Sequence, residues 1–164
     1  MPIERSGVSA EMMISGIHHI AISTRDIERS VEFYRDLLGF EEVLRFEWPV
    51  GSTVMDTLSG LSGSSGKIAM LKAANTFVEI LQYETPIPSA VNPNRPVCDL
   101  GISHIALTVG NVSSEYARLT AAGMSFHCAP LDLQPGMRAT YGRDPDGNVV
   151  ELLEISDVEN PMFL

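Results

Sequence analysis

Two histidine–glutamate pairs recur at corresponding places in two similar halves of the chain. His19 heads the run HIAIS, and His104 heads the run HIALT. Further along, Glu79 lies in the apolar run FVEIL and Glu151 lies in VVELL. Two imidazoles and two carboxylates form a donor set that suits a borderline first-row divalent ion, with positions left for water or substrate. The repeat therefore predicts one metal site shared by both halves.

The surroundings of the two glutamates support this interpretation. Because successive strand residues point to opposite faces, Glu79 shares its face with the apolar Phe77 and Leu81. A carboxylate in such a setting needs a partner that compensates its charge. A single strand histidine or glutamate is more often a packed or solvent-facing residue. Four of them at matched positions favour a metal site over independent packing.

Apolar periodicity predicts the same order of elements in both halves. Apolar and other side chains alternate over residues 16–23, which favours a strand. Asp26 is placed to cap a helix that runs to about Leu38. A glycine then closes the helix in each half, Gly39 and Gly123. The fold class is therefore α+β, with two paired β-α-β-β-β modules. The remaining predicted elements are strands over 40–46, 67–71 and 76–83, then a strand over 102–109, a helix over 112–122 and strands near 125–127, 137–143 and 148–155.

The segments between these elements suggest how the chain is divided. Residues 48–66 are rich in Gly and Ser and are expected to form a loop or lid without a core face of its own. Residues 85–100 contain four of the ten prolines, a composition typical of a semi-rigid linker. The expected divisions are a flexible N-terminal arm over 1–15, a first module over 16–84, the linker over 85–100, a second module over 101–156 and a tail over 157–164.

Composition limits the partners and the compartment. The 164 residues carry a formal net charge of -10, which argues against nucleic acid or an anionic membrane as the main partner. The two cysteines are too few for a disulfide framework, so we expect a reducing cytoplasm, with Cys128 packed and unreactive. No stretch approaches the ~20 apolar residues of a membrane helix. These features fit a cytoplasmic protein that acts on a small molecule.

Three motifs carry a resemblance to a known family: GIHHIAI from Gly16, FYRDLLGF ending at Phe40, and DPDGNVVEL from Asp144. Over residues 16–156 the chain resembles the vicinal oxygen chelate superfamily, which includes glyoxalase I, methylmalonyl-CoA epimerase, extradiol dioxygenases, and fosfomycin and bleomycin resistance proteins. The resemblance implies a half-open barrel around a cavity that holds one divalent metal ion (Zn, Ni, Co, Mn or Fe). His18 is expected to face away from this cavity. The implied ligands are His19, Glu79, His104 and Glu151.

The ligand pattern resembles glyoxalase I most and the epimerases next. The resemblance implies a metal-dependent lyase or isomerase that moves a proton on carbon next to a carbonyl, through a metal-stabilised enolate. By position, Glu151 would be a ligand that loosens and acts as the base, with Glu79 as the second candidate. The epimerases typically have Gln where this chain has Glu79, which weakens that reading. For glutathione carboxylates the chain offers three cations: Arg45, Arg138 and Arg143.

Two other functions remain open. The resemblance to extradiol ring-cleaving dioxygenases would give acid–base roles to His127 and Tyr141, although four protein ligands would crowd the metal. Bleomycin-sequestering members use the same fold to bind an antibiotic without metal ligands. We also expect a homodimer, because the half-open sheets have edges and faces to cover. The segment 144–148 is expected to be a structural turn.

Overall fold

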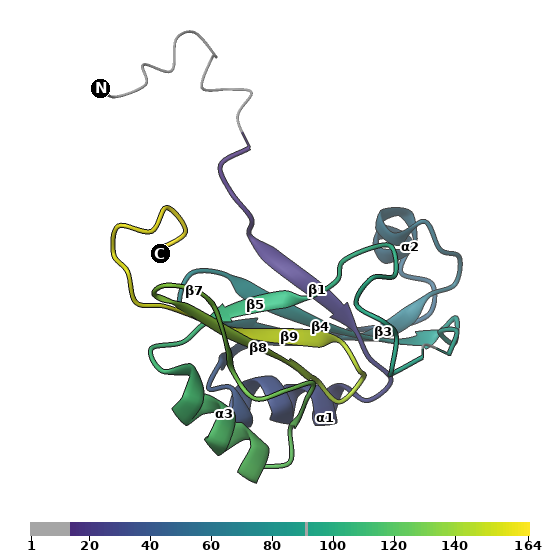
Figure 1. Ribbon diagram of the computed structural model, residues 1–164. Helices are drawn as coiled ribbons and strands as arrows, with labels where there is room; N and C mark the ends of the chain where they lie inside the picture. Colours follow the sequence, from purple (N-terminus) through teal and green to yellow (C-terminus); the bar gives the residue numbers. More distant parts are fainter. Residues whose placement is uncertain (1–13, 91) are drawn as a thin grey trace, which may run out of the picture.

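The computed structural model describes residues 14–90 and 92–164 as two β-sheets, with α1 and α3 on one side of them and α2 on the other (Figure 1). This confirms the predicted α+β fold class. The first sheet has the strand order β1-β4-β3-β2, and the second has the order β5-β9-β8-β6 with β7 paired to β8. The elements of the first half are β1 (His19–Ser23), α1 (Ile27–Val31), the π-helix η2 (Glu32–Leu37), β2 (Glu41–Trp48), α2 (Thr53–Ser59), β3 (Ser65–Lys72) and β4 (Phe77–Thr85). Those of the second half are β5 (Ile105–Thr108), α3 (Val112–Ala121), β6 (Ser125–Phe126), β7 (Leu131–Gln134), β8 (Met137–Arg143) and β9 (Val149–Ile155).

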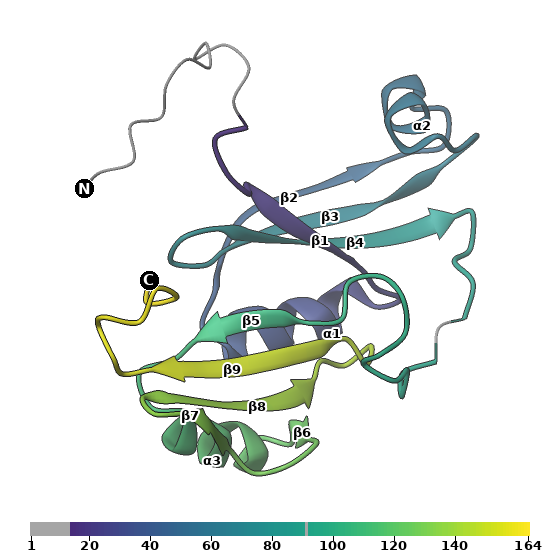
Figure 2. The ribbon, with the colours of Figure 1, turned by 45° about the horizontal axis from the view of Figure 1, so that its top comes forward.

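The two halves repeat the same strand pairing. The first strand of each half runs parallel to the last, β1 beside β4 and β5 beside β9. Ala21 lies opposite Glu79 in the first pair, and Ala106 lies opposite Glu151 in the second. The internal repeat in the sequence therefore corresponds to a repeat in register. Figure 2 shows β1 and β5 at the edges where the two sheets approach each other.

Matched side chains cap the two main helices. Asp26 Oδ1 accepts a hydrogen bond from Arg29 N at 3.1 Å, as predicted for a helix N-cap. In the second half, Asn111 caps α3 through Ser114 N at 2.8 Å.

A strand side chain three residues beyond each glutamate also satisfies the first N–H of each helix. Gln82 Oε1 accepts from Ile27 N at 2.9 Å, and Glu154 Oε2 accepts from Val112 N at 2.7 Å. These contacts tie the helix of each half to the strand that carries its glutamate.

The helix of the first half widens after one turn. It is α-helical to Val31 and π-helical from Glu32 to Leu37, so it ends where the sequence predicts. Gly39 and Gly123 follow the two helices with φ values of 81° and 94°, a conformation that favours glycine. The helix of each half therefore stops at the glycine that closes it in the sequence pattern.

The hydrophobic core lies between the helices and the sheet faces that they cover. It is continuous across both halves, so the two halves fold around shared packing. Its buried members are Ile22, Ile27, Val31, Phe33, Tyr34, Ala69, Leu71, Val78, Ile80, Val112, Leu119, Met124, Val150 and Leu152.

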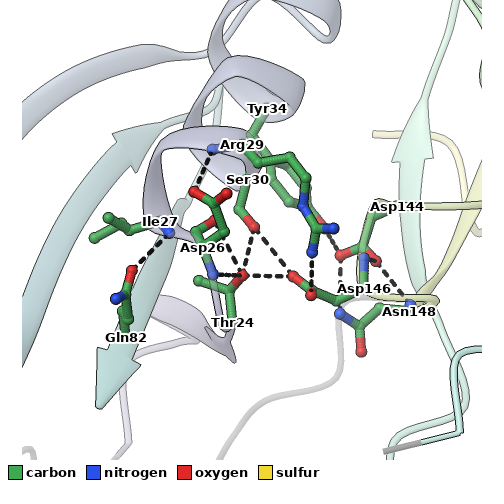
Figure 3. A network of polar contacts seen from close by, with 10 residues as sticks. All are labelled: Thr24, Asp26, Ile27, Arg29, Ser30, Tyr34, Gln82, Asp144, Asp146 and Asn148. Carbon is green, nitrogen blue, oxygen red and sulfur yellow. Dashed lines mark hydrogen bonds and ion pairs between the residues drawn. The ribbon is translucent and has the colours of Figure 1, made fainter. Parts of the chain in front are cut away.

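The turn after β8 also joins the halves (Figure 3). Tyr34 Oη donates to Asp144 Oδ2 at 3.0 Å, and both residues are buried. Asp146 accepts from Arg29 Nη2 at 2.5 Å and from Thr24 Oγ1 at 2.6 Å. We call these five residues the module clamp. The segment predicted as a turn is a turn, and it also holds the second half against the helix of the first.

For residues 48–66 the sequence predicts a loop or lid without a core face, and the plain loop is wrong because the segment forms a helix. That helix has no buried residue and takes no part in the hydrophobic core, as expected. The segment contains α2, and its two ends are tied together by buried groups. Trp48 is 5% exposed and its Nε1 donates to Ser64 Oγ at 3.1 Å. Asp56 accepts hydrogen bonds from the N–H groups of Gly63 and Ser64. The Ser64 hydroxyl and these two N–H groups hold the pKa of Asp56 below its ordinary value.

Three smaller features also bear on the sequence predictions. The short strand β7 was not predicted, and Cys128 is exposed, where packing was expected. Most of the expected N-terminal arm, residues 1–13, lies outside the described residues. Within the described part of the chain, no helix has both the length and the apolar character needed to cross a membrane.

Candidate metal centre

The first His–Glu pair joins β1 to β4. His19 begins β1, and Glu79 lies near the start of β4. His19 Nε2 is 3.7 Å from Glu79 Oε2. The His19 side chain is 40% exposed and the Glu79 side chain 17%, so the imidazole remains open to solvent. We call these two residues the first half-site.

The second pair repeats this arrangement on the second sheet. His104 directly precedes β5, and Glu151 lies in β9. His104 Nε2 is 3.1 Å from Glu151 Oε2, and the side chains are 30% and 10% exposed. We call these residues the second half-site. Its His–Glu distance is shorter than that of the first half-site, and its side chains are less exposed.

Strand alternation explains how the sheets accommodate both carboxylates. Val78 and Ile80 flank Glu79 and are buried in the core, so Glu79 points to the opposite face. Val150 and Leu152 place Glu151 in the same way. Because α1 and α3 cover the core face, the two half-sites lie on the sheet faces away from these helices (Figure 1).

The two half-sites are not gathered into one cluster within a single chain. Across residues 14–90 and 92–164, no group of three or more His, Cys, Asp or Glu side chains is placed to hold a metal ion. His19 is brought to Glu79 and His104 to Glu151, but the pairs stay apart. That all four residues share one ion therefore stays a prediction.

Neighbouring side chains orient the two imidazoles. His104 Nδ1 is 2.8 Å from Ser103 Oγ, which leaves Nε2 directed at Glu151. A polar partner on the second ring nitrogen is the usual way to fix a ligating histidine. His19 Nδ1 is 2.9 Å from the ring of His18, which stacks on Phe77 with centroids 5.1 Å apart. His18 precedes β1 and does not line the cavity between β1 and β5, and its orientation relative to a bound metal stays a prediction.

Tyr141 distinguishes the second half-site from the first. It lies opposite Glu151 on β8, and its ring centroid is 5.0 Å from that of His104. Burial, and then the charge of Glu151, raise the pKa of Tyr141 above its ordinary value. The hydroxyl therefore stays protonated and can donate a hydrogen bond. At the corresponding place in the first half, Met70 lies opposite Glu79 and brings no such group.

A cavity of about 380 Å³ borders the second half-site. It lies between β1 and β5, and Ser103 and His104 form part of its wall. A shallow hollow of about 670 Å³ runs along β2 and includes neither half-site. The cavity between β1 and β5 is therefore the concave site that a small molecule near His104 would occupy.

The three arginines considered as anion-binding cations have different surroundings. Arg45 pairs with Glu42 and Glu28, and Arg138 pairs with Asp132. Within the described part of the chain, Arg143 has no carboxylate partner, and it lines the same cavity as His104.

Known proteins resemble this chain in sequence and in fold. Residues 16–152 match the Glyoxalase/Bleomycin resistance protein/Dioxygenase superfamily. The chain belongs to this superfamily. It is 28% identical over 143 residues to YwkD of Bacillus subtilis, covering 87% of this chain and 99% of that one. It is 30% identical over 138 residues to YaeR of Escherichia coli, covering 84% and 95%.

Solved structures of the superfamily share the fold. A glyoxalase family protein from Bacillus cereus superimposes with a TM-score of 0.81 at 20% identity, covering 92% of this chain and all of that one. The lactoylglutathione lyase of Agrobacterium tumefaciens gives a TM-score of 0.57 at 21% identity, over 87% and 95% of the two chains. A 2-epi-5-epi-valiolone epimerase from Actinomyces is 27% identical over 106 residues, 62% of this chain and 57% of the relative. Superfamily membership confirms the resemblance seen in the sequence.

Proposed function

We propose that the protein is a metal-dependent lyase or isomerase that moves a proton on a carbon next to a carbonyl group. The observation that carries this proposal is the pair of matched half-sites. Each places one imidazole nitrogen beside one carboxylate, at the same register position of its own sheet. The superfamily, with its lactoylglutathione lyase and its epimerase relative, supports this class of reaction.

The donor set fits a divalent first-row ion. Together the half-sites offer two imidazole nitrogens and two carboxylates, which suits Zn, Ni, Co, Mn or Fe. A bound ion would supply a positive charge that polarises the carbonyl of the substrate. His19, Glu79, His104 and Glu151 would hold it, with Ser103 fixing the orientation of the His104 ring.

A second copy of the chain would complete the site. In one chain the half-sites lie apart, and the faces that carry them also carry exposed apolar side chains. On the face of Glu79, Leu44 is 51% exposed and Phe46 is 40% exposed. On the face of Glu151, Leu131 is 56% exposed. Exposed apolar groups of this kind mark contact surfaces. The homodimer would bring the first half-site of one copy to the second half-site of the other.

Glu151 is the proposed base. Its side chain is the less exposed of the two carboxylates, and its neighbours His104 and Tyr141 are both polar. In this setting it would take a proton from the substrate carbon and return it to a neighbouring position. The Tyr141 hydroxyl would donate a hydrogen bond to a substrate oxygen. Glu79 is the alternative base.

Elemental analysis of untagged protein purified without chelator tests the metal site. We expect about one equivalent of Zn, Ni, Co, Mn or Fe per chain in the native protein, and loss in Glu79→Ala and in Glu151→Ala. Glu159→Ala, in the exposed C-terminal segment, is the matched control and should keep the metal. Failure of the native protein to take up any of these ions would refute the site and would favour a binding protein instead.

The reaction class needs its own test. The hemithioacetal of methylglyoxal and glutathione is a suitable first substrate, with the reaction followed in D₂O by NMR so that deuterium entering at carbon is detected. A wider set of hydroxyketones and acid thioesters follows. Metal-loaded native protein should catalyse exchange on at least one compound, and Glu151→Gln should abolish it. Exchange that persists in Glu151→Gln would move the role of base to Glu79.

A ring-cleaving dioxygenase is the second candidate, favoured by one observation. The His127 and Tyr141 rings lie 6.3 Å apart, and the Tyr141 ring lies beside that of His104, which would give catechol chemistry an acid–base pair. The iron content of the native protein and oxygen uptake with catechol separate this candidate from the first.

A further inference from the structure

The cavity between β1 and β5 carries a charge pattern that the proposed reaction does not explain. Arg95 comes from the segment before β5 and Arg143 from the end of β8, and both line the cavity. Asp146 is the acidic residue in its wall. The Asp146 carboxylate already accepts hydrogen bonds from Arg29 and Thr24 of the module clamp, and from Ser30 (Figure 3). It does not neutralise the two cavity arginines.

Arg95 and Arg143 differ from most arginines of the described regions, which have a carboxylate partner. The net charge is -10, and most arginines of the described regions pair with an acid: Arg29, Arg35, Arg45, Arg118 and Arg138 all do. Within residues 14–90 and 92–164, neither Arg95 nor Arg143 forms an ion pair. Two positive charges therefore face one cavity in an acidic protein.

Backbone carbonyls hold both guanidinium groups in place. Arg143 Nη1 donates to Gly147 O at 2.6 Å, and Arg143 Nη2 donates to Arg95 O at 2.9 Å. Arg95 Nη2 donates to Ile102 O at 2.9 Å. Carbonyls are neutral, so they orient the side chains without cancelling their charge. A guanidinium has five N–H donors, and these contacts leave donors on both groups.

We propose that this cavity is an anion-binding site in which Arg95 and Arg143 hold a carboxylate or phosphate group of a small organic molecule. Guanidinium groups match both anions in geometry and charge. The volume of about 380 Å³ holds more than an inorganic ion. Ile20, Ile105 and Val97 add apolar wall for the organic part. Both positive charges are therefore positioned at the cavity without a ligand.

The position of the cavity also specifies a substrate class. Because His104 shares its wall, a molecule anchored by its acid group would extend toward the second half-site. The substrate would then be a carbonyl compound that carries a carboxylate or phosphate. This extension rests on the proposed function, whereas anion binding itself does not.

Isothermal titration calorimetry on full-length, chelator-treated protein tests the site directly. The probes are inorganic phosphate, phenyl phosphate and benzoate, which separate the two anion chemistries and the contribution of the organic part. We expect saturable binding of at least one organic probe, more tightly than of inorganic phosphate. Arg95→Gln and Arg143→Gln should each weaken it roughly tenfold or more, because each removes a charge-assisted contact.

Two controls separate this site from general electrostatics and from the metal. Lys72→Gln removes a cation that also has no ion pair in the described regions but lies outside the cavity, and it should change affinity by less than about twofold. Glu79→Ala changes a proposed metal ligand that lies outside the cavity, and it should keep anion binding while losing metal. Arg95 makes one backbone contact, so Arg95→Gln provides a test even if Arg143→Gln folds poorly.

The proposal is overturned by any of three results. The first is that none of the three probes binds saturably. The second is that Lys72→Gln weakens binding as much as Arg95→Gln does. The third is that a probe binds only when the metal is present, with an affinity that Arg95→Gln does not change. A protein that binds anions through these arginines but holds no metal would refute the proposed function and leave the anion site intact.

Discussion

Tyr34→Phe is the most informative test of how the two halves are held together. Tyr34 is 1% exposed, and its hydroxyl donates to Asp144 Oδ2 at 3.0 Å. Asn148 Nδ2 donates to the same oxygen at 2.8 Å. Burial, and then the Asp144 carboxylate, hold the pKa of Tyr34 well above its ordinary value, so the phenol remains a donor. Phenylalanine keeps the ring and removes only this hydrogen bond.

The expected loss follows from that geometry. A hydrogen bond to a charged group contributes about 1.5–3 kcal/mol, and Asp144 Oδ2 keeps one of its two donors in the variant. We therefore expect the free energy of unfolding to fall by about 2 kcal/mol. For a chain of this size that corresponds to a decrease in Tm of roughly 4–8 °C. Urea unfolding followed by circular dichroism measures the former, and calorimetry the latter.

Tyr116→Phe is the matched control, because the Tyr116 ring packs on Phe126 and no hydrogen bond of its hydroxyl is found in the described regions. It should change the free energy of unfolding by less than about 0.5 kcal/mol. If Tyr34→Phe were equally mild, the module clamp would not contribute to stability and the halves would be held by apolar packing alone.

Three other predictions concern the site, the loop and the linker. Glu151→Gln should reduce turnover by at least about a hundredfold, the usual range for an acid–base residue, while urea unfolding shows little loss of stability. The pKa of Asp56 is lowered in the folded state, so its ionised carboxylate stabilises the fold above the ordinary carboxyl pKa, and this stabilisation is lost as the pH falls through the folded pKa. Asp56→Asn should therefore flatten the acid side of a plot of Tm against pH. An unchanged plot would contradict this. Gly147 has a φ of 88°, and an added Cβ would lie 2.1 Å from Pro93 O, so Gly147→Ala should lower the free energy of unfolding by more than about 2 kcal/mol in a urea titration. Gly110→Ala is the control: no atom lies within 4 Å of its added Cβ, so the change should be small.

The sequence predicts well the features that depend on local pattern. Asp26 caps a helix, Gly39 and Gly123 close one in each half, and the strands that carry Glu79 and Glu151 lie where alternation places them. These features need only the periodicity of a strand or helix and the geometry of a cap. The repeat also identifies which His and Glu side chains share a sheet face.

Features that depend on contacts between distant residues are harder to predict. The module clamp joins residues more than a hundred positions apart, and nothing in the turn around Asp144 indicates its partner Tyr34. Helix α2 lies in a segment whose Gly and Ser content suggests a loop, and a buried bond from Trp48 to Ser64 stabilises it. Strand β7 has only four residues between two prolines. The role of Arg95 beside Arg143 also emerges only when the linker folds over the turn after β8.

The relation of the two half-sites is a further limit of sequence reasoning. The repeat indicates that both His–Glu pairs serve one function, but the pattern is the same whether they meet within a chain or between two chains. In one chain the shared core places the helices together and leaves both half-sites on the opposite sheet faces. The proposed four-ligand site therefore requires a second copy of the chain.

Complementation between two inactive variants tests that dependence most directly. His19→Ala and His104→Ala, carrying two different histidine-free peptide tags, are co-expressed and purified through both tags as a mixed dimer. If each ion is held by the first half-site of one copy and the second half-site of the other, one of the two sites contains all four ligands. The mixed dimer should then hold about half the native metal content, while each variant alone holds almost none. Metal content no higher in the mixed dimer than in the separate variants would contradict the shared site.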